Sequence, residues 1–133
     1  MKKVMAYVLV LLVLSGVAYG ESKTCDLKLN VYERLKISGF LPKRSNFEKA
    51  MIISDITAKL KLKQEDIVLY EIKSAENSIS WNEKGSEAIS FTFTETELQV
   101  LKDSLEEVNK KDEVEAVPAF IELYKKIKNV EAK

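Results

Sequence analysis

The chain has 133 residues, with 21 basic and 21 acidic side chains, one cysteine and no histidine. This balance lacks the basic excess of a nucleic-acid-binding protein. The missing histidine excludes imidazole catalysis and histidine-containing metal sites, and one cysteine excludes an internal disulfide framework.

Residues 1–20 have the order of a secretory signal peptide. Two lysines precede an uncharged apolar run, and small residues end the segment at Ala18 and Gly20; this order is typical of an export signal. We therefore predict cleavage between Gly20 and Glu21 and a periplasmic or secreted protein. The alternatives are an uncleaved membrane anchor over residues 4–19 and a buried helix. As a helix, that run would span about 24 Å, less than the roughly 30 Å hydrocarbon core, which favours the cleaved signal.

Residues 21–133 are expected to form a single domain, because a chain of this length is in the one-domain range. Cys25 lies close to its predicted start. In an oxidising compartment an odd cysteine is a candidate for an intermolecular disulfide with a second chain. The alternative is a thiol in a loose N-terminal leader, since chain termini are commonly poorly ordered.

The first helices are predicted from their caps. Asn30 and Glu33 have capping-box spacing, which predicts a helix over residues 31–38 that ends at Gly39. Asn46 precedes a longer helix over residues 47–61. Its two apolar stripes predict the central helix, buried against two neighbours; they consist of Ile53, Ile56 and Leu60, and of Phe47, Met51, Ala58 and Leu62. Residues 64–72 fit a short helix or a strand, and we favour the helix.

A change of period predicts a β-hairpin. Ile79 and Trp81 alternate with polar residues, and a short loop follows. Ile89, Phe91 and Phe93 then alternate in the same way. A lone hairpin is marginally stable in water, so we expect its apolar face, with Trp81, to belong to the core.

Two further helices complete the predicted domain. Thr94 and Glu97 form a second capping box before a helix with Leu98, Leu101, Leu105 and Val108 on one face. Pro118 begins a last helix that ends at about Asn129 and buries Phe120, Leu123, Tyr124 and Ile127. The predicted fold class is α+β, mainly helical, with four to five helices packed on one β-hairpin.

Three basic residues are candidate partner contacts. Lys43 and Arg44 precede a helix N-terminus, where cations oppose the helix dipole, so local structure gives no reason for them. They fit an anionic partner, or else a loop whose charges only keep the surface soluble. Lys84 at the tip of the predicted hairpin is the third candidate. No catalytic, cofactor or metal site is predicted, and the domain is expected to fold without a metal ion or a cofactor.

Several short motifs resemble a family of small bacteriophage and prophage proteins of unassigned function. The resemblance spans about residues 27–128 and is carried by Asn30-Val31-Tyr32-Glu33-Arg34-Leu35, Leu41-Pro42, Asn46-Phe47, Trp81-Asn82 and Leu123-Tyr124. It implies a mobile-element origin and a compact, mainly helical unit, and it supplies no catalytic residue. Members of that family start near the equivalent of Leu27, so the export signal of this chain is a departure.

The expected function is that of a small exported, non-catalytic protein that binds an unknown macromolecular partner other than nucleic acid. A membrane-tethered accessory protein is one alternative. An enzyme with carboxylate or Ser/Lys chemistry is the other, although nothing in the spacing of these residues singles out a catalytic pair.

Overall fold

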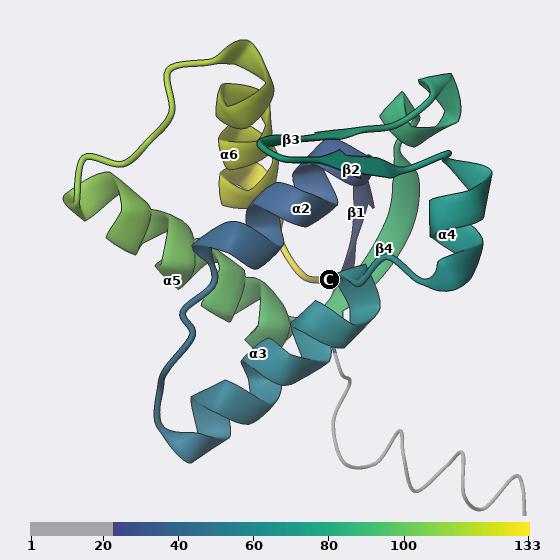
Figure 1. Cartoon of the computed structure of the whole chain (residues 1–133). Coiled ribbons are helices and arrows are strands. Elements are labelled where there is room, and N and C mark those ends of the chain that lie inside the picture. Colours follow the sequence, from purple (N-terminus) through teal and green to yellow (C-terminus); the bar gives the residue numbers. More distant parts are fainter. Residues whose placement is uncertain (1–22) are drawn as a thin grey trace, which may run out of the picture.

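The computed structural model describes residues 23–133, so the predicted signal peptide and its cleavage site lie outside the described residues (Figure 1). In chain order the elements are β1 (Thr24–Leu29), α2 (Val31–Phe40), α3 (Phe47–Leu60), α4 (Gln64–Leu69), β2 (Lys73–Ala75), β3 (Ser78–Ser80), a 3₁₀ helix (Glu83–Ser86), β4 (Ile89–Thr94), α5 (Glu95–Lys110) and α6 (Pro118–Asn129). The predicted class, α+β and mainly helical, is confirmed.

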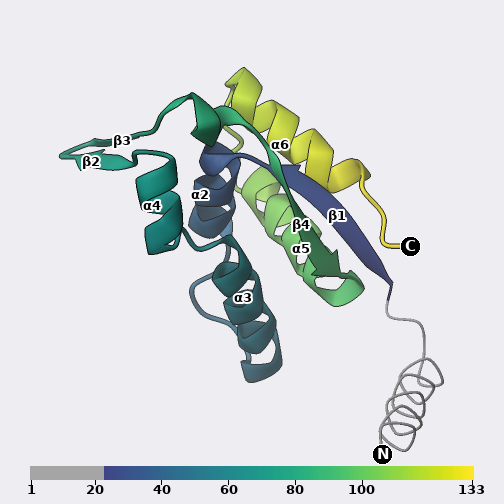
Figure 2. The same ribbon diagram turned by 90° about the vertical axis from the view of Figure 1, so that its right-hand side faces the viewer.

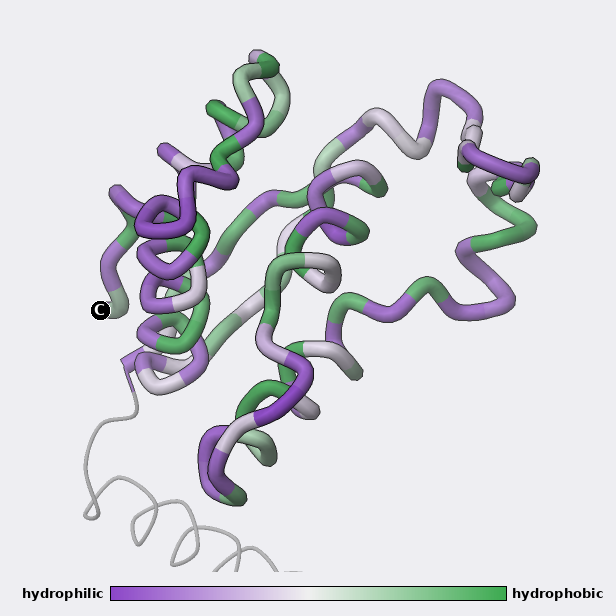
Figure 3. The backbone as a smooth tube through the Cα atoms, turned by 60° about the vertical axis from the view of Figure 1, so that its left-hand side comes forward, coloured by the Kyte–Doolittle hydropathy of each residue, from purple (hydrophilic) through white to green (hydrophobic). Residues whose placement is uncertain are grey.

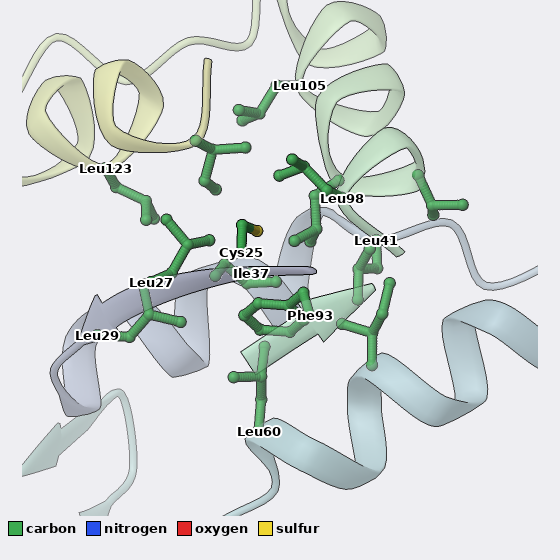
Figure 4. Packing of buried hydrophobic residues seen from close by; sticks show 14 residues of the cluster. Cys25, Leu27, Leu29, Ile37, Leu41, Leu60, Phe93, Leu98, Leu105 and Leu123 are labelled. Atoms are coloured by element: carbon green, nitrogen blue, oxygen red, sulfur yellow. The ribbon is translucent and has the colours of Figure 1, made fainter. Parts of the chain in front are cut away.

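The core lies between the β1–β4 sheet and the longer helices. β1 and β4 pair in antiparallel fashion, and α5 packs against both strands and against α2, α3 and α6 (Figure 2). Alternate residues of β1 point into this core, where they meet Phe93 of β4 and the leucines of α5 (Figure 4). Hydrophobic and hydrophilic residues alternate along the helices, as expected for elements with one buried face (Figure 3).

The predicted hairpin is wrong. β4 pairs with β1, with Cys25 opposite Phe93, whereas β3 pairs with β2. The segment between β3 and β4 does not reverse as a tight turn, because the Asn82 side chain accepts a hydrogen bond from the Gly85 amide and caps a 3₁₀ helix. This helix leads β4 away from β3 and toward the free edge of β1.

Trp81 is half-buried and lies outside the core cluster, so its predicted place in the core is also wrong. Its ring packs against the backbone of Gly85. A Cβ at position 85 would lie 2.7 Å from Trp81 Cδ1, closer than carbon atoms can approach. The ring can therefore take this position only because residue 85 is glycine.

The prediction that α3 is the central helix is likewise wrong. Ile56 and Leu60 on one stripe are buried, but Phe47 and Met51 on the other stripe are 77% and 53% exposed. α5 takes the central place instead, because five of its apolar side chains are buried; they are Leu98, Val100, Leu101, Leu105 and Val108.

Several predicted ends and caps are confirmed. Both capping boxes form, at Asn30 with Glu33 and at Thr94 with Glu97. α4 is a helix, and α6 has the predicted bounds. α2, however, continues through Gly39 to Phe40; it stops there because the residue before a proline is held in an extended conformation.

Two helix-capping glutamates also join helices to one another. Glu33 accepts a hydrogen bond from the Asn30 amide at the start of α2, and it pairs with Lys126 of α6 at 2.7 Å. Glu97 caps α5 in the same way and pairs with Lys59 of α3. Both carboxylates are buried, and burying an ionised carboxylate without partners would be costly. Each pair therefore fixes the start of one helix against a neighbour.

Arg34 joins three helices from a buried position. It projects from α2, and its Nε donates to the Leu60 carbonyl at the end of α3 at 3.0 Å. Its Nη2 donates to the Lys61 carbonyl at 3.0 Å and pairs with Asp66 of α4 at 3.4 Å. The guanidinium also lies 4.9 Å from the centre of the Phe91 ring. The Arg34 side chain thus supplies hydrogen-bond donors to two carbonyl groups at the C-terminal end of α3, and its ion pair with Asp66 holds the start of α4.

Two helices end on residues with positive φ that are not glycine. Glu71 follows α4 with φ 50°, and Asp112 follows α5 with φ 56°. After α5, the amide of Glu113 donates to the Val108 carbonyl at 2.9 Å, and an equivalent bond closes α4. Both ends are Schellman caps, a motif that favours glycine at the left-handed position.

Substituting Glu71→Gly should raise the free energy of unfolding by up to about 1 kcal/mol. A residue with a side chain costs about 1–2 kcal/mol in the left-handed region, and the greater backbone entropy of glycine in the unfolded chain offsets part of the gain. Urea denaturation measures the change. Glu87→Gly is the matched control, because Glu87 has φ −81° and its substitution should lower stability. A loss of stability in both variants would contradict the strain argument.

Candidate functional site

A groove of about 1070 Å³ lies on the described part of the chain. Its walls are α2, the turn between β2 and β3, the C-terminal half of α5 and the loop from α5 to α6. On α2 the lining residues are Tyr32, Leu35, Lys36, Gly39 and Phe40, which follow helical spacing along one face. The opposite face of α2 is held in the core by Arg34 and Ile37, so the groove face is fixed outward.

The floor of the groove is apolar. Tyr32, Leu35 and Phe40 of α2 face it together with Ile79 of β3 and Phe120 of α6. Ile79 is 46% exposed, an open position for a large aliphatic side chain. Apolar surface in a concave site is the usual basis of ligand affinity, because binding removes it from water.

The rim of the groove is acidic. Its charged lining residues are two cations, Lys36 and Lys111, and four acids, Glu76, Glu107, Glu113 and Glu115, which leaves a net charge of −2. Lys36 is already paired with Glu115 at 2.6 Å and lies 5.7 Å from the centre of the Tyr32 ring. Glu107 is paired with Lys110 at 3.7 Å, so the attraction for positive charge comes mainly from Glu76 and Glu113.

Hydroxyl groups at the groove are few and are not set up as nucleophiles. Ser104 is buried, and its hydroxyl donates to the Val100 carbonyl at 2.7 Å. Ser74 and Ser78 are exposed on the β2–β3 arm. Among residues 23–133 there is no group of three or more acidic or cysteine side chains able to hold a metal ion. The groove lining offers apolar surface together with a small excess of negative charge.

The three basic residues predicted as partner contacts do not line the groove. Lys43 and Arg44 are exposed in the loop between α2 and α3, beside a smaller hollow of about 320 Å³. Lys84 is exposed in the 3₁₀ helix. The α2–α3 loop and the segment that follows β3 lie well apart in both ribbon views, so these residues do not form one site (Figures 1 and 2).

Cys25 lies in β1 and not in a loose leader, and an intermolecular disulfide would require its thiol to leave this buried position. It is a core residue of β1 with 6% of its surface exposed, and its side chain points toward the inner face of the sheet near Phe93 (Figure 4). Burial raises the pKa of the thiol above its ordinary value of 9.0, and the negative charge of Asp26 adds to the rise. The folded domain therefore withholds this thiol from a second chain.

The Cys25 thiol should react with a water-soluble disulfide reagent only when the domain unfolds. The thiolate is the reactive form, and both burial and the raised pKa lower its amount. The same shift makes folding stability highest below about pH 9 and lower as the pH rises through the folded-state pKa, because the unfolded thiol ionises more readily. Labelling rates in buffer and in urea test this; rapid labelling or covalent dimers in buffer would contradict it.

No protein-family model matches the chain, and neither a curated protein nor a solved structure shows significant similarity to it. None of the helices between residues 23 and 133 is sufficiently long and apolar to cross a membrane.

The groove could not be found from local sequence signals. Its walls come from residues 32–42, 74–79 and 104–120, which only the tertiary fold brings together. The one local hint is the helical spacing of Tyr32, Leu35, Lys36 and Gly39, which marks a partly apolar face of α2 opposite its core residues.

Proposed function

We propose that this protein is a small exported, non-catalytic binding module of mobile-element origin, and that its groove binds a segment of another protein. The groove itself carries this proposal, because its lining combines large apolar side chains with charged residues whose net charge is −2. Small-molecule pockets typically measure roughly 300–1,000 Å³, so a groove of this size has room for several side chains of a partner.

The charge of the rim favours a cationic segment. Glu76 and Glu113 line the groove from two different segments, the β2–β3 turn and the α5–α6 loop, so a partner in the groove meets an acid from each. Complementary charge speeds association and disfavours partners of the same sign. Nucleic acid, whose backbone is negative, is thereby disfavoured at this groove.

Photo-crosslinking in cells that make the protein tests the proposed function. A photoreactive amino acid at Ile79 should form one discrete adduct with a partner, because Ile79 is exposed at the groove. The control position is Val68 of α4, which is 68% exposed and away from the groove. Charge reversal at Glu76 and Glu113 should weaken the Ile79 adduct. Identical adducts from both positions, or none from Ile79, would argue against a partner in the groove.

The proposed export has its own test, since the sequence favours cleavage after Gly20 and leaves a tethered accessory protein as the alternative. Intact-mass measurement on periplasmic or secreted material should show a chain that starts at Glu21. Full-length protein in the membrane fraction would support the tethered form, and full-length protein in the soluble cytoplasm would contradict export.

A further inference from the structure

The first turns of α3 expose two large apolar side chains side by side. Phe47 is 77% exposed and Met51 is 53% exposed, and their i, i+4 spacing places them on one stripe of the helix. Isolated exposed apolar residues are ordinary, but this pair occupies a protruding end of the molecule next to a basic loop (Figures 1 and 2).

The surroundings of this stripe are positive. Residues 43–51 contain three basic side chains, Lys43, Arg44 and Lys49, and one acid, Glu48, for a net charge of +2. Within residues 23–133, none of the three cations is ion-paired. The N-terminal end of α3 adds the positive end of its dipole, which repels these cations unless an anion is present.

A hollow of about 320 Å³ lies between the basic loop and α3. Its lining is mixed: two cations, Lys43 and Arg44, lie beside four hydroxyl residues and four apolar residues. This hollow is next to the exposed stripe. Together they present an anion-attracting hollow and an apolar stripe side by side, as the interface of a membrane requires.

We propose that Lys43, Arg44, Phe47 and Met51, which we call the α3 tip, form a surface that docks on a membrane containing anionic lipids. Phe47 and Met51 insert at the level of the headgroups, while the basic side chains keep their charges at the phosphates. Each basic residue near an anionic surface strengthens binding by about fivefold. The surface is distinct from the groove and does not depend on the function proposed for it.

Tryptophan fluorescence of the full chain reconstituted in vesicles tests the proposal. All variants carry Trp81→Phe, so that the only indole is the one introduced by Phe47→Trp or, in the matched control, by Val68→Trp. Both positions are exposed and apolar, but α4 has no comparable cluster of cations beside Val68. The vesicles consist of phosphatidylcholine alone or with phosphatidylglycerol, and each composition is prepared with and without brominated acyl chains.

In anionic vesicles, the indole of Phe47→Trp should shift its emission to the blue and be quenched by the brominated chains. Lys43→Glu with Arg44→Glu should abolish both effects, and Lys43→Gln with Arg44→Gln should weaken them. High salt should reduce them as well, because ions screen the attraction. Far-UV circular dichroism checks that each variant is folded. An unquenched Phe47→Trp indole, or equal quenching of Val68→Trp, would overturn the proposal.

Discussion

Replacing Arg34 with methionine is expected to lower the free energy of unfolding by about 3–5 kcal/mol, because it breaks a buried charged network while keeping the side-chain volume. The guanidinium is 4% exposed and donates to the carbonyls of Leu60 and Lys61, which then lose their partner. Asp66 loses its ion pair, although its side chain is 22% exposed and water offsets part of that loss. Urea denaturation gives the measurement.

Two further variants separate this network from a general effect of charge. Lys36→Met removes an ion pair with Glu115 whose partners are 35% and 46% exposed, and it should cost less than about 1 kcal/mol. Arg34→Lys should recover little of the lost stability, because one ammonium group cannot reproduce the planar fork that bonds two carbonyls and a carboxylate. A midpoint for Arg34→Met equal to that of the parent protein would show that the network does not hold the helices.

The second large effect is expected at Phe93. Its ring is completely buried on β4 opposite Cys25, and the Lys59 ammonium lies 5.4 Å from its centre. Phe93→Ala should therefore lower the free energy of unfolding by about 3–5 kcal/mol.

Trp81→Ala is the comparison for Phe93→Ala. It should cost about 1–2 kcal/mol, because the indole is half-buried against Gly85 and outside the core cluster. Equal losses in the two variants would mean that Trp81, which follows β3, belongs to the core, and would favour the hairpin expected from the sequence.

The parts of the fold that depend on local chemistry were predictable from the sequence. Asn30 with Glu33 and Thr94 with Glu97 mark helix starts, because a short side chain can satisfy the first amides only at that spacing. The apolar spacing of α5 and α6 likewise identifies their buried faces. These signals involve residues within a few positions of one another, so no knowledge of the tertiary fold is needed.

Pairing between distant strands was not predictable in this way. A period-two pattern says that Phe91 and Phe93 share a face with one another, but it does not say which strand lies beside them. The same pattern is present at Cys25, Leu27 and Leu29, where proximity to the predicted cleavage site favoured a loose leader. If residues 24–29 are taken as a strand, their three buried side chains form one apolar face, and β1 then becomes the neighbour with which β4 pairs.

The second roles of the capping acids and the candidate site are also properties of the tertiary fold. Glu33 was identified as a cap, yet its pairing with Lys126 joins residues 93 positions apart. α3 has apolar residues on two sides, and only the packing shows that Phe47 and Met51 remain exposed. The groove combines three separate segments, none of which has a sequence motif of its own.

The central claim is that the groove binds a cationic, partly apolar segment, and nuclear magnetic resonance of isotope-labelled protein tests it most directly. A short peptide of leucine and lysine should shift the amide signals of groove residues such as Leu35, Gly39 and Ile79. A matched peptide with glutamate in place of lysine should leave them unchanged, and charge reversal at Glu76 and Glu113 should weaken the response to the cationic peptide. Equal shifts with both peptides, or shifts confined to other surfaces, would contradict the claim.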